Sequence, residues 1–308
     1  MISLLSTLLN GLSLGSVYAI IALGYTMVYG IAKMLNFAHG DVIMIGAYIT
    51  YSAIAYWKLP PLLGFLLAMV VSTVLGVVIE SLAYKPLRQA TSLAVLITAI
   101  GISYLLQNGA QLIWGATPKV FPTMFSLPNA SLFGGSVTIS NNTISLLEGR
   151  LMISGNMLVT ILACVIIMVC LSLFINKTKM GKAMRCVSED KGAAELMGVN
   201  VNLTISLTFA IGSALAAVAG VLQCTSYSTF QHTMGAMPGI KAFTAAVFGG
   251  IGSIPGAMVG GILLGIIEML GKTFVSDQLG DAFAFAVLII VLLVKPTGLL
   301  GKKVHEKV

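Results

Sequence analysis

Charged residues are scarce in this sequence of 308 residues. Asp, Glu, Lys and Arg together make up 9% of it, whereas soluble domains carry about 25%. Hydrophobic residues make up 57%, and the mean hydropathy is +1.00. So few charges exclude a soluble globular enzyme. They also exclude a nucleic-acid-binding module, although the formal net charge is +7.

Residues that carry catalytic or metal chemistry are equally scarce. The four cysteines form no Cys-x-x-Cys pair, and the three histidines lie far apart, so we expect neither a disulfide framework nor a metal site. No phosphate-binding loop is present, because Gly181-Lys182 is followed by Ala183. Zinc-protease and serine-hydrolase motifs are absent too. We therefore expect no catalytic residue, no metal and no cofactor in this chain, which is not an enzyme by itself.

Long apolar runs dominate the chain, and a membrane span needs about 20 such residues. Two shorter runs, 42–57 and 240–251, adjoin polar or Pro/Gly-rich breaks and are expected to be broken half-helices. The sequence thus predicts an all-α polytopic membrane protein, a helical bundle of about nine spans in one domain (1–308), with eight spans as the alternative. The clear runs are 4–29, 62–83, 93–113, 157–175, 203–223, 257–270 and 282–294.

Lysine and arginine set the expected orientation. With nine crossings, eleven of the 17 basic residues fall on one side, in the loop 176–202, between the third and fourth spans, and at the C-terminus. The positive-inside rule then places these regions in the cytoplasm, with the N-terminus outside and the C-terminus inside.

The stretch 115–155 falls outside in this arrangement. Residues 136–146 alternate apolar and polar side chains around Asn141-Asn142, which predicts a β-hairpin. The alternative is a solvated cap without regular structure.

Two short strings recur along the chain. Gly15-Ser16-x-x-Ala19-x-x-Ala22 matches the string that starts at Gly212, and Val78-Ile79-Glu80-Ser81-Leu82 resembles the string around Glu268. Because nine spans run each first copy opposite to its second, the pattern favours an inverted-topology repeat, which is typical of alternating-access transporters. Coincidence in a Gly- and Ala-rich chain is the alternative.

The loop 176–202 contains a predicted helix of about ten residues. Ser188 is a suitable N-cap, Glu189 and Asp190 place negative charge in the first turn, and Gly198 can close the helix in a left-handed conformation. The segment is either an ordinary solvated loop or a coupling helix that docks on an ATPase.

Four long strings resemble one family: residues 18–30, Asn36-Phe37-Ala38-His39-Gly40-Asp41, 181–200 and 241–256. They are similar to the permeases of ATP-binding-cassette (ABC) importers, and most closely to the branched-chain amino acid (LivHM) permease family of the binding-protein-dependent transport superfamily. The resemblance runs from residue 12 to 301 and is weakest in 115–155.

That resemblance implies a transport subunit that moves leucine, isoleucine or valine inward by alternating access. It implies a second, LivM-like permease, two LivG/LivF-like ATPases that bind ATP and Mg, an external substrate-binding protein, and no nucleic acid. Permeases of this family for urea, short amides or other amino acids stay open as alternatives. An ion-coupled secondary carrier and a passive channel are disfavoured, because the spans are almost uncharged and a channel needs no ATPase-docking helix.

The resemblance also assigns candidate residues. Coupling to the ATPase is expected at Gly181, Arg185, Glu189, Ala193, Ala194, Glu195, Gly198 and Asn200. Asn36, His39, Gly40 and Asp41 are expected either to line the substrate path or to brace the break between two spans. Lys241 could meet a substrate carboxylate, but its sequence context favours snorkelling to the outer surface.

Small residues spaced four apart predict a close-packing helix face, which serves a permease–permease or a half–half interface. These glycines are Gly252, Gly256, Gly260, Gly261 and Gly265.

Overall fold

The computed structural model describes residues 2–124, 130–132, 137–140, 142–146, 151–295 and 297–301. Within these residues, seven helices are long and apolar enough to cross a membrane. Each of the seven clear apolar runs of the sequence lies inside one of them, so the prediction of a polytopic helical membrane protein is confirmed. They are Ser3–Ala32, Pro61–Tyr84, Ser92–Trp114, Gly155–Lys177, Val201–Ser226, Ile254–Phe274 and Asp277–Val294.

Helix ends follow the local sequence. Pro61 lies in the first turn of α3 and Pro255 in the first turn of α10, where a missing amide hydrogen is not needed. Asn200 caps α8 by accepting a hydrogen bond from the Leu203 amide. The helices are α1 (Ile2–Ala32), α2 (His39–Ala55), α3 (Pro61–Ile79), the π-helical turn η1 (Glu80–Tyr84), α4 (Ser92–Trp114), α5 (Gly155–Lys177), α6 (Lys179–Glu189), α7 (Lys191–Leu196), α8 (Val201–Ser226), α9 (Ala236–Gly249), α10 (Ile254–Phe274), the 3₁₀ turn η3 (Asp277–Leu279) and α11 (Gly280–Val294).

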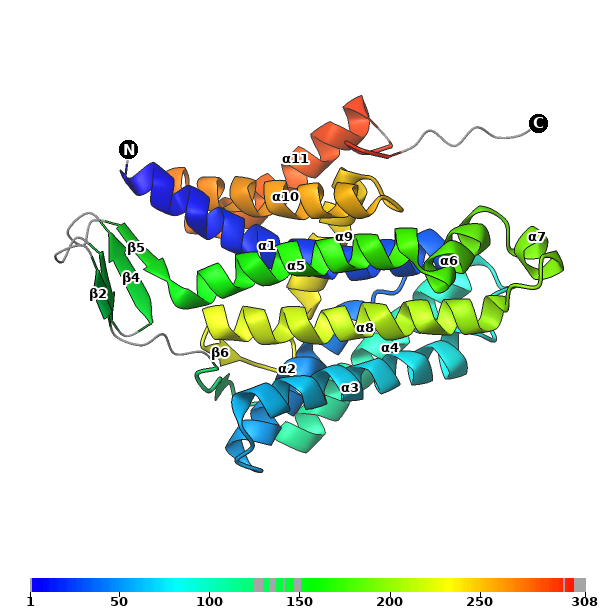
Figure 1. Cartoon of the computed structure of the whole chain (residues 1–308), viewed down its shortest axis with the longest axis horizontal. Coiled ribbons are helices and arrows are strands. Elements are labelled where there is room, and N and C mark those ends of the chain that lie inside the picture. Colours follow the sequence, from blue (N-terminus) through cyan, green and yellow to red (C-terminus); the bar gives the residue numbers. More distant parts are fainter. Residues whose placement is uncertain are drawn as a thin grey trace.

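Strands occupy the segment between α4 and α5 (Figure 1). β2 (Ala130–Leu132), β3 (Val137–Ser140), β4 (Thr143–Leu146) and β5 (Leu151–Ser154) form an antiparallel sheet in chain order. Ser140 pairs with Thr143 where β3 and β4 meet, and Asn142 has φ 63°; Asn141 lies outside the described residues. A separate pair, β1 (Lys119–Val120) and β6 (Thr229–Phe230), ties the end of α4 to the end of α8.

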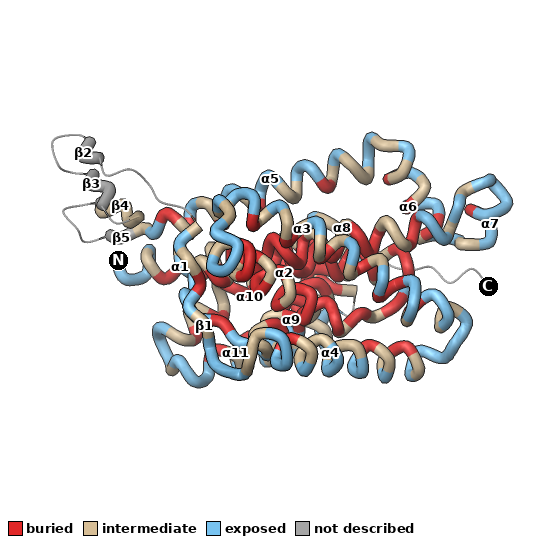
Figure 2. The backbone as a smooth tube through the Cα atoms, turned by 90° about the horizontal axis from the view of Figure 1, so that it is seen from below, coloured by how far each residue is buried: buried red, intermediate tan, exposed pale blue. Residues whose placement is uncertain are grey.

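The core is built around α1 and α8. Buried residues make up 78% of the apolar window of α8 and 56% of that of α1, against 17% for α4 and α5 and 11% for the span that contains α11. Figure 2 shows this buried interior with exposed residues on the outer helices. The peripheral helices therefore turn apolar side chains outward, as lipid contact requires.

Glycines bring helices into backbone contact. A Cβ added to Gly261 or Gly265 on α10 would collide with the backbone of Ala19 or Gly15 on α1, and one added to Gly260 or Gly256 would collide with α9. The predicted close-packing face is therefore used within the chain. Gly252 differs: its φ is +94° and the space around it is open, so it serves a turn and not a packing face.

The helices that pack on α1 and those that pack on α8 occupy corresponding places in the chain. The α10 helix packs on α1 and α3 packs on α8, while α9 packs on α1 and α2 packs on α8. In Figure 1, α1 and α8 run in opposite directions, and so do α3 and α10. The starts of α2 and α9, His39 and Ala236, are 197 residues apart, the same spacing as between Gly15 and Gly212.

Substituting Gly261 with alanine tests the α1–α10 contact. The added methyl group overpacks two backbones that cannot repack, and we expect a loss of about 1–3 kcal/mol or more and a lower yield of monodisperse protein. Gly101→Ala on α4 is the matched control, because a Cβ added there meets no atom of another helix within 4 Å. Size-exclusion profiles and apparent Tm in detergent provide the readout. Equal behaviour of the two variants would contradict the contact.

Candidate functional site

The break between α1 and α2 is sealed by packing. Asn36, His39 and Asp41 are 4%, 1% and 1% exposed. The Asn36 Oδ1 accepts a hydrogen bond from the Tyr84 hydroxyl at 2.9 Å, and the Asp41 Oδ1 accepts one from the Gln107 amide at 2.9 Å. These predicted site residues therefore contact the chain itself and hold α2 against η1 and α4.

His39 and Gly40 mark the crossing of the two short helices with the core. The His39 ring lies against Tyr25, with ring centroids 4.6 Å apart, and fits between Gly24 on α1 and Gly212 on α8. A Cβ at Gly40 would lie 2.5 Å from the Gly235 carbonyl oxygen and 3.2 Å from the Gly239 Cα, so α2 and α9 begin back to back. Only glycine allows this approach.

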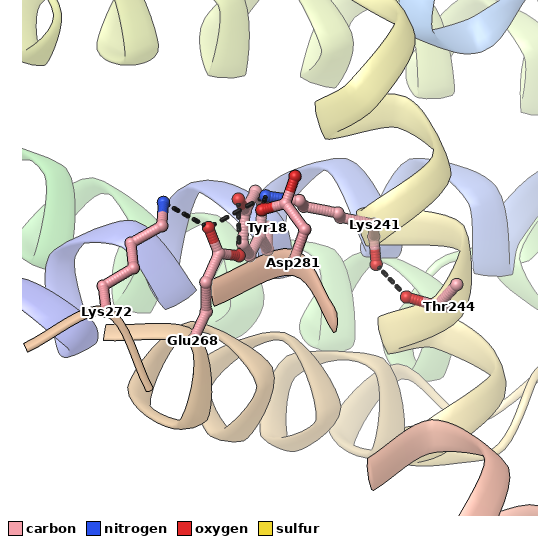
Figure 3. Close-up of polar contacts among 6 residues, drawn as sticks. All are labelled: Tyr18, Lys241, Thr244, Glu268, Lys272 and Asp281. Atoms are coloured by element: carbon pink, nitrogen blue, oxygen red, sulfur yellow. Dashed lines mark hydrogen bonds and ion pairs between the residues drawn. The ribbon is translucent and has the colours of Figure 1, made fainter. Parts of the chain in front are cut away.

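A cluster of four charges joins α9, α10 and α11 (Figure 3). The Lys241 ammonium group lies 2.8 Å from Glu268 and 2.6 Å from Asp281, and Lys272 lies 2.7 Å from the same Glu268 oxygen. The Tyr18 hydroxyl on α1 donates to the other Glu268 oxygen at 3.0 Å. We call Lys241, Glu268, Lys272 and Asp281 the charge cluster.

The charge cluster is electrically balanced and graded in exposure. The side chains of Glu268 and Lys241 are 1% and 7% exposed, whereas those of Lys272 and Asp281 are 25% and 43% exposed. The snorkelling orientation expected for Lys241 is therefore wrong, because two carboxylates satisfy its ammonium group inside the protein. Sequence reasoning missed Asp281 and Tyr18; the Glu268–Lys272 spacing of four residues was the one readable signal.

A second buried glutamate lies at the end of α3. Glu80 is 0% exposed and opens η1. One of its oxygens pairs with Arg88, and the other accepts a hydrogen bond from Ser206 on α8 at 2.6 Å. Arg88 also donates to Asn202 near the start of α8. A buried carboxylate thus joins two helices and the loop after η1.

The predicted coupling segment forms two helices with a different boundary. Because Met184 and Val187 are buried, α6 continues through Ser188 and Glu189. The N-cap of α7 is Asp190, whose side chain accepts from the Ala193 amide at 3.0 Å, and not Ser188. Six residues later α7 ends, and Gly198 takes the expected left-handed conformation with φ +80°.

Exposure divides the candidate coupling residues into two groups. Gly181 is packed against the end of α5 and Ala194 is 3% exposed, so both face the chain itself. Two large apolar side chains that the sequence analysis did not single out, Leu196 at 91% and Met197 at 84%, project from α7. The exposed members of the predicted set are Arg185, Glu189, Ala193, Glu195, Gly198 and Asn200.

A cavity of about 240 Å³ lies between α1, α5, α8 and α10. Neutral polar side chains, including Asn10, Ser13 and Asn156, share its wall with Leu14 and Val17. Such a mixed, uncharged wall admits water or a small polar solute.

These features define a class of protein: a polytopic helical permease, with buried polar and charged groups among its helices and two exposed apolar side chains, Leu196 and Met197, at one end. The chain belongs to the family described as branched-chain amino acid transport system / permease component, whose model matches residues 7–292.

Full-length relatives agree with the family. The chain is 46% identical to BraD of Pseudomonas aeruginosa, with 99% of this chain and 98% of BraD covered. It is 44% identical to LivH of Escherichia coli K12, with 99% and 97% covered. Both are named high-affinity branched-chain amino acid transport system permease proteins. A probable branched-chain amino acid permease, LivH of Methanocaldococcus jannaschii, is 28% identical over 92% of this chain.

A double-mutant cycle tests the charge cluster. Lys241→Met leaves two carboxylates short of a partner, and removing one member of a buried pair costs about 3–5 kcal/mol. The double variant Lys241→Met/Glu268→Gln should lose less stability than the two single variants added together, because each removes the other's unpaired charge. Apparent Tm in detergent measures both, with the exposed Lys58→Met as control. Strict additivity would show that Lys241 and Glu268 do not interact.

Proposed function

We propose that this chain is the transmembrane permease subunit of an ABC importer that moves leucine, isoleucine and valine into a bacterial cell. The observation that carries this conclusion is the identity of 44–46% to high-affinity branched-chain amino acid permeases over 99% of the chain. Those relatives favour branched-chain amino acids over urea, short amides and other amino acids.

The proposed architecture has nine crossings of the inner membrane in two inverted repeats. Seven full spans support it, and in Figure 1 the short helices α2 and α9 complete the path of the chain between successive spans. The exchanged pairings of α1 with α10 and α8 with α3 are those that a two-fold axis in the membrane plane produces. We assign α1–α4 to one repeat and α8–α11 to the other.

The proposed orientation places the ends of α6 and α7 in the cytoplasm. Lys177, Lys179, Lys182 and Arg185 lie at or near that end, and Arg88 is bonded to Asn202 beside it. The sheet β2–β5 lies at the other end of the molecule in Figure 1, which is the outer side. This assignment follows the positive-inside rule.

The proposed mechanism is alternating access driven by ATP hydrolysis in separate partner subunits. The subunit binds no ATP; two partner ATPases bind ATP and Mg, a second related permease completes the pathway, and an external binding protein delivers the amino acid. ATP binding shifts the permeases between two states only if the ATPases bind those states differently. That difference must enter through the surface on which the ATPases dock.

We assign that surface to α7 and the turn after it. Leu196 and Met197 are almost fully exposed at the end of the molecule where basic residues gather, so they are not lipid-facing side chains. An apolar pair on a short helix is suited to a hydrophobic groove on a partner. Ala194 lies on the buried face of α7, which packs against the rest of the chain.

Replacing Leu196 with glutamate tests the docking. The charge would be buried against an apolar groove, so we expect the variant to insert normally but to co-purify with less than a tenth of the wild-type ATPase and to lose leucine uptake. Leu196→Met keeps the apolar contact and is the control. Wild-type ATPase retention in Leu196→Glu would remove the docking assignment.

Cysteine labelling tests the orientation. Cys186 on α6 is exposed and serves as a native reporter once the other three cysteines are replaced by serine. A membrane-impermeant maleimide should modify it only after the cells are opened. In a chain that lacks all native cysteines, Thr143→Cys on β4 should react in intact cells. Labelling of Cys186 in intact cells would contradict the proposed sidedness.

A further inference from the structure

The first residue of α7 is bonded to the last residue of α1. The Lys191 ammonium group donates to the Ala32 carbonyl oxygen at 3.0 Å, and Lys33 then leaves the helix with φ 59°. Three cations, Lys191, Arg88 and Lys33, lie near the carbonyl end of α1. Burial lowers the pKa of Lys191, and the nearby charges of Arg88 and Lys33 lower it further. A helix C-terminus attracts such charges. The coupling segment, residues 176–202, is thus hydrogen-bonded to α1 at Ala32, directly before the break that precedes α2.

The far end of the coupling segment is held through Arg88. Asn200 caps α8, which follows α7, and Asn202, two residues later, accepts a hydrogen bond from Arg88. The same guanidinium group pairs with Glu80, and Glu80 accepts a hydrogen bond from Ser206 on α8. The guanidinium group donates to both acceptors at once through separate nitrogens, Nη1 to Asn202 and Nη2 to Glu80.

From Glu80 the contacts return to the break. Glu80 and Tyr84 are the first and last residues of η1, and both are 0% exposed. The Tyr84 hydroxyl donates to Asn36 at 2.9 Å, while its ring packs on Phe209 of α8 with centroids 5.2 Å apart. η1 continues α3 as a π-helical turn, a conformation that is rare and often lies at a functional site. Two chains of contacts therefore link α7 to the break, one at Ala32 and one at Asn36.

We propose that Lys191, Arg88 and Glu80 are positioning residues that transmit movement of the ATPase-docked α7 to the break before α2. This inference rests on the proposed function and names the residues that couple ATP hydrolysis to transport. The break, residues 33–38, is the element that changes, because it is non-helical chain held at both ends by these contacts. Coupling requires a physical network that joins the two sites, and each contact here is a buried or charge-assisted bond.

The charge cluster provides an internal comparison. Glu268 occupies the position that matches Glu80 in the repeated strings, and it too bonds to the first helix of the other repeat, at Tyr18. Its described partners come from α1, α9 and α10, and none from α6 or α7. Only the glutamate beside the coupling segment is in a position to transmit its movement.

The test uses the complete importer, with its partner subunits, in proteoliposomes. Lys191→Met and the double variant Glu80→Gln/Arg88→Met should retain the ATPases and hydrolyse ATP within about twofold of wild type. Their leucine uptake per ATP hydrolysed should fall at least tenfold. Removing both charges of the Glu80–Arg88 pair avoids an unpaired buried carboxylate, so the double variant should fold. Lys191→Arg, which still donates to the Ala32 carbonyl, should restore coupling.

Lys85→Met is the matched control, because Lys85 lies in the same loop as Arg88 and is exposed. Wild-type uptake per ATP in Lys191→Met and in the double variant would overturn the inference. Loss of the ATPases from these variants would overturn it as well, since it would assign the residues to docking and leave the proposed function intact. An unmodified complex without ATP-dependent uptake would refute the proposed function and this inference with it.

Discussion

A bilayer offers no water to a backbone amide or to a charge, so these groups are costly inside the membrane unless the protein itself supplies their partners. In this chain that constraint determines which helices are central. The α1 and α8 helices carry small residues, such as Gly15 and Gly212, at their crossings and are the most buried of the spans. The irregular chain before α2 is held by its neighbours: Asn36 accepts a hydrogen bond from Tyr84 of η1, and the Phe37 ring packs on Phe243 of α9. Lipid meets the apolar faces of α4, α5 and α11.

The same constraint explains the two buried glutamates. A lone carboxylate in a span is costly, and each of these has acquired cationic and hydroxyl partners: Arg88 and Ser206 for Glu80, and two lysines and Tyr18 for Glu268. Because α3 and α10 run in opposite directions, the two glutamates tie the bundle near opposite ends. One tie joins η1, at the end of α3, to α8, and the other joins α10 to α1; in the proposed arrangement each links the third helix of one repeat to the first helix of the other. A transporter that alternates its open side can use such ties, since one end must hold while the other opens.

The sequence was sufficient for the features that depend on composition and spacing. Apolar runs located the seven spans, and the glycine series on α10 indicated close packing. It was insufficient where tertiary contacts decide. Ser188 could cap the next helix only if α6 ended before residue 188. Met184 and Val187 are buried against the rest of the chain, and α6 continues to Glu189, so Asp190 is the N-cap instead. The partner of Lys241, Glu268, is remote in sequence, so composition alone favoured the wrong orientation for that side chain. Ala194 is buried and Leu196 is exposed, although they lie two residues apart on α7. The helix has only six residues, too few for a periodic pattern in the sequence to show which face is buried.

The central claim is that this chain forms a pathway for branched-chain amino acids that opens only under the control of separate ATPases. Uptake of radiolabelled leucine into proteoliposomes tests it most directly, with the chain reconstituted first alone and then with the subunits that co-purify from its native membrane. The account predicts no leucine accumulation by the chain alone, and accumulation by the complex only when ATP and the external binding protein are both supplied. Concentrative uptake by the chain alone, driven by a proton or sodium gradient, would contradict it.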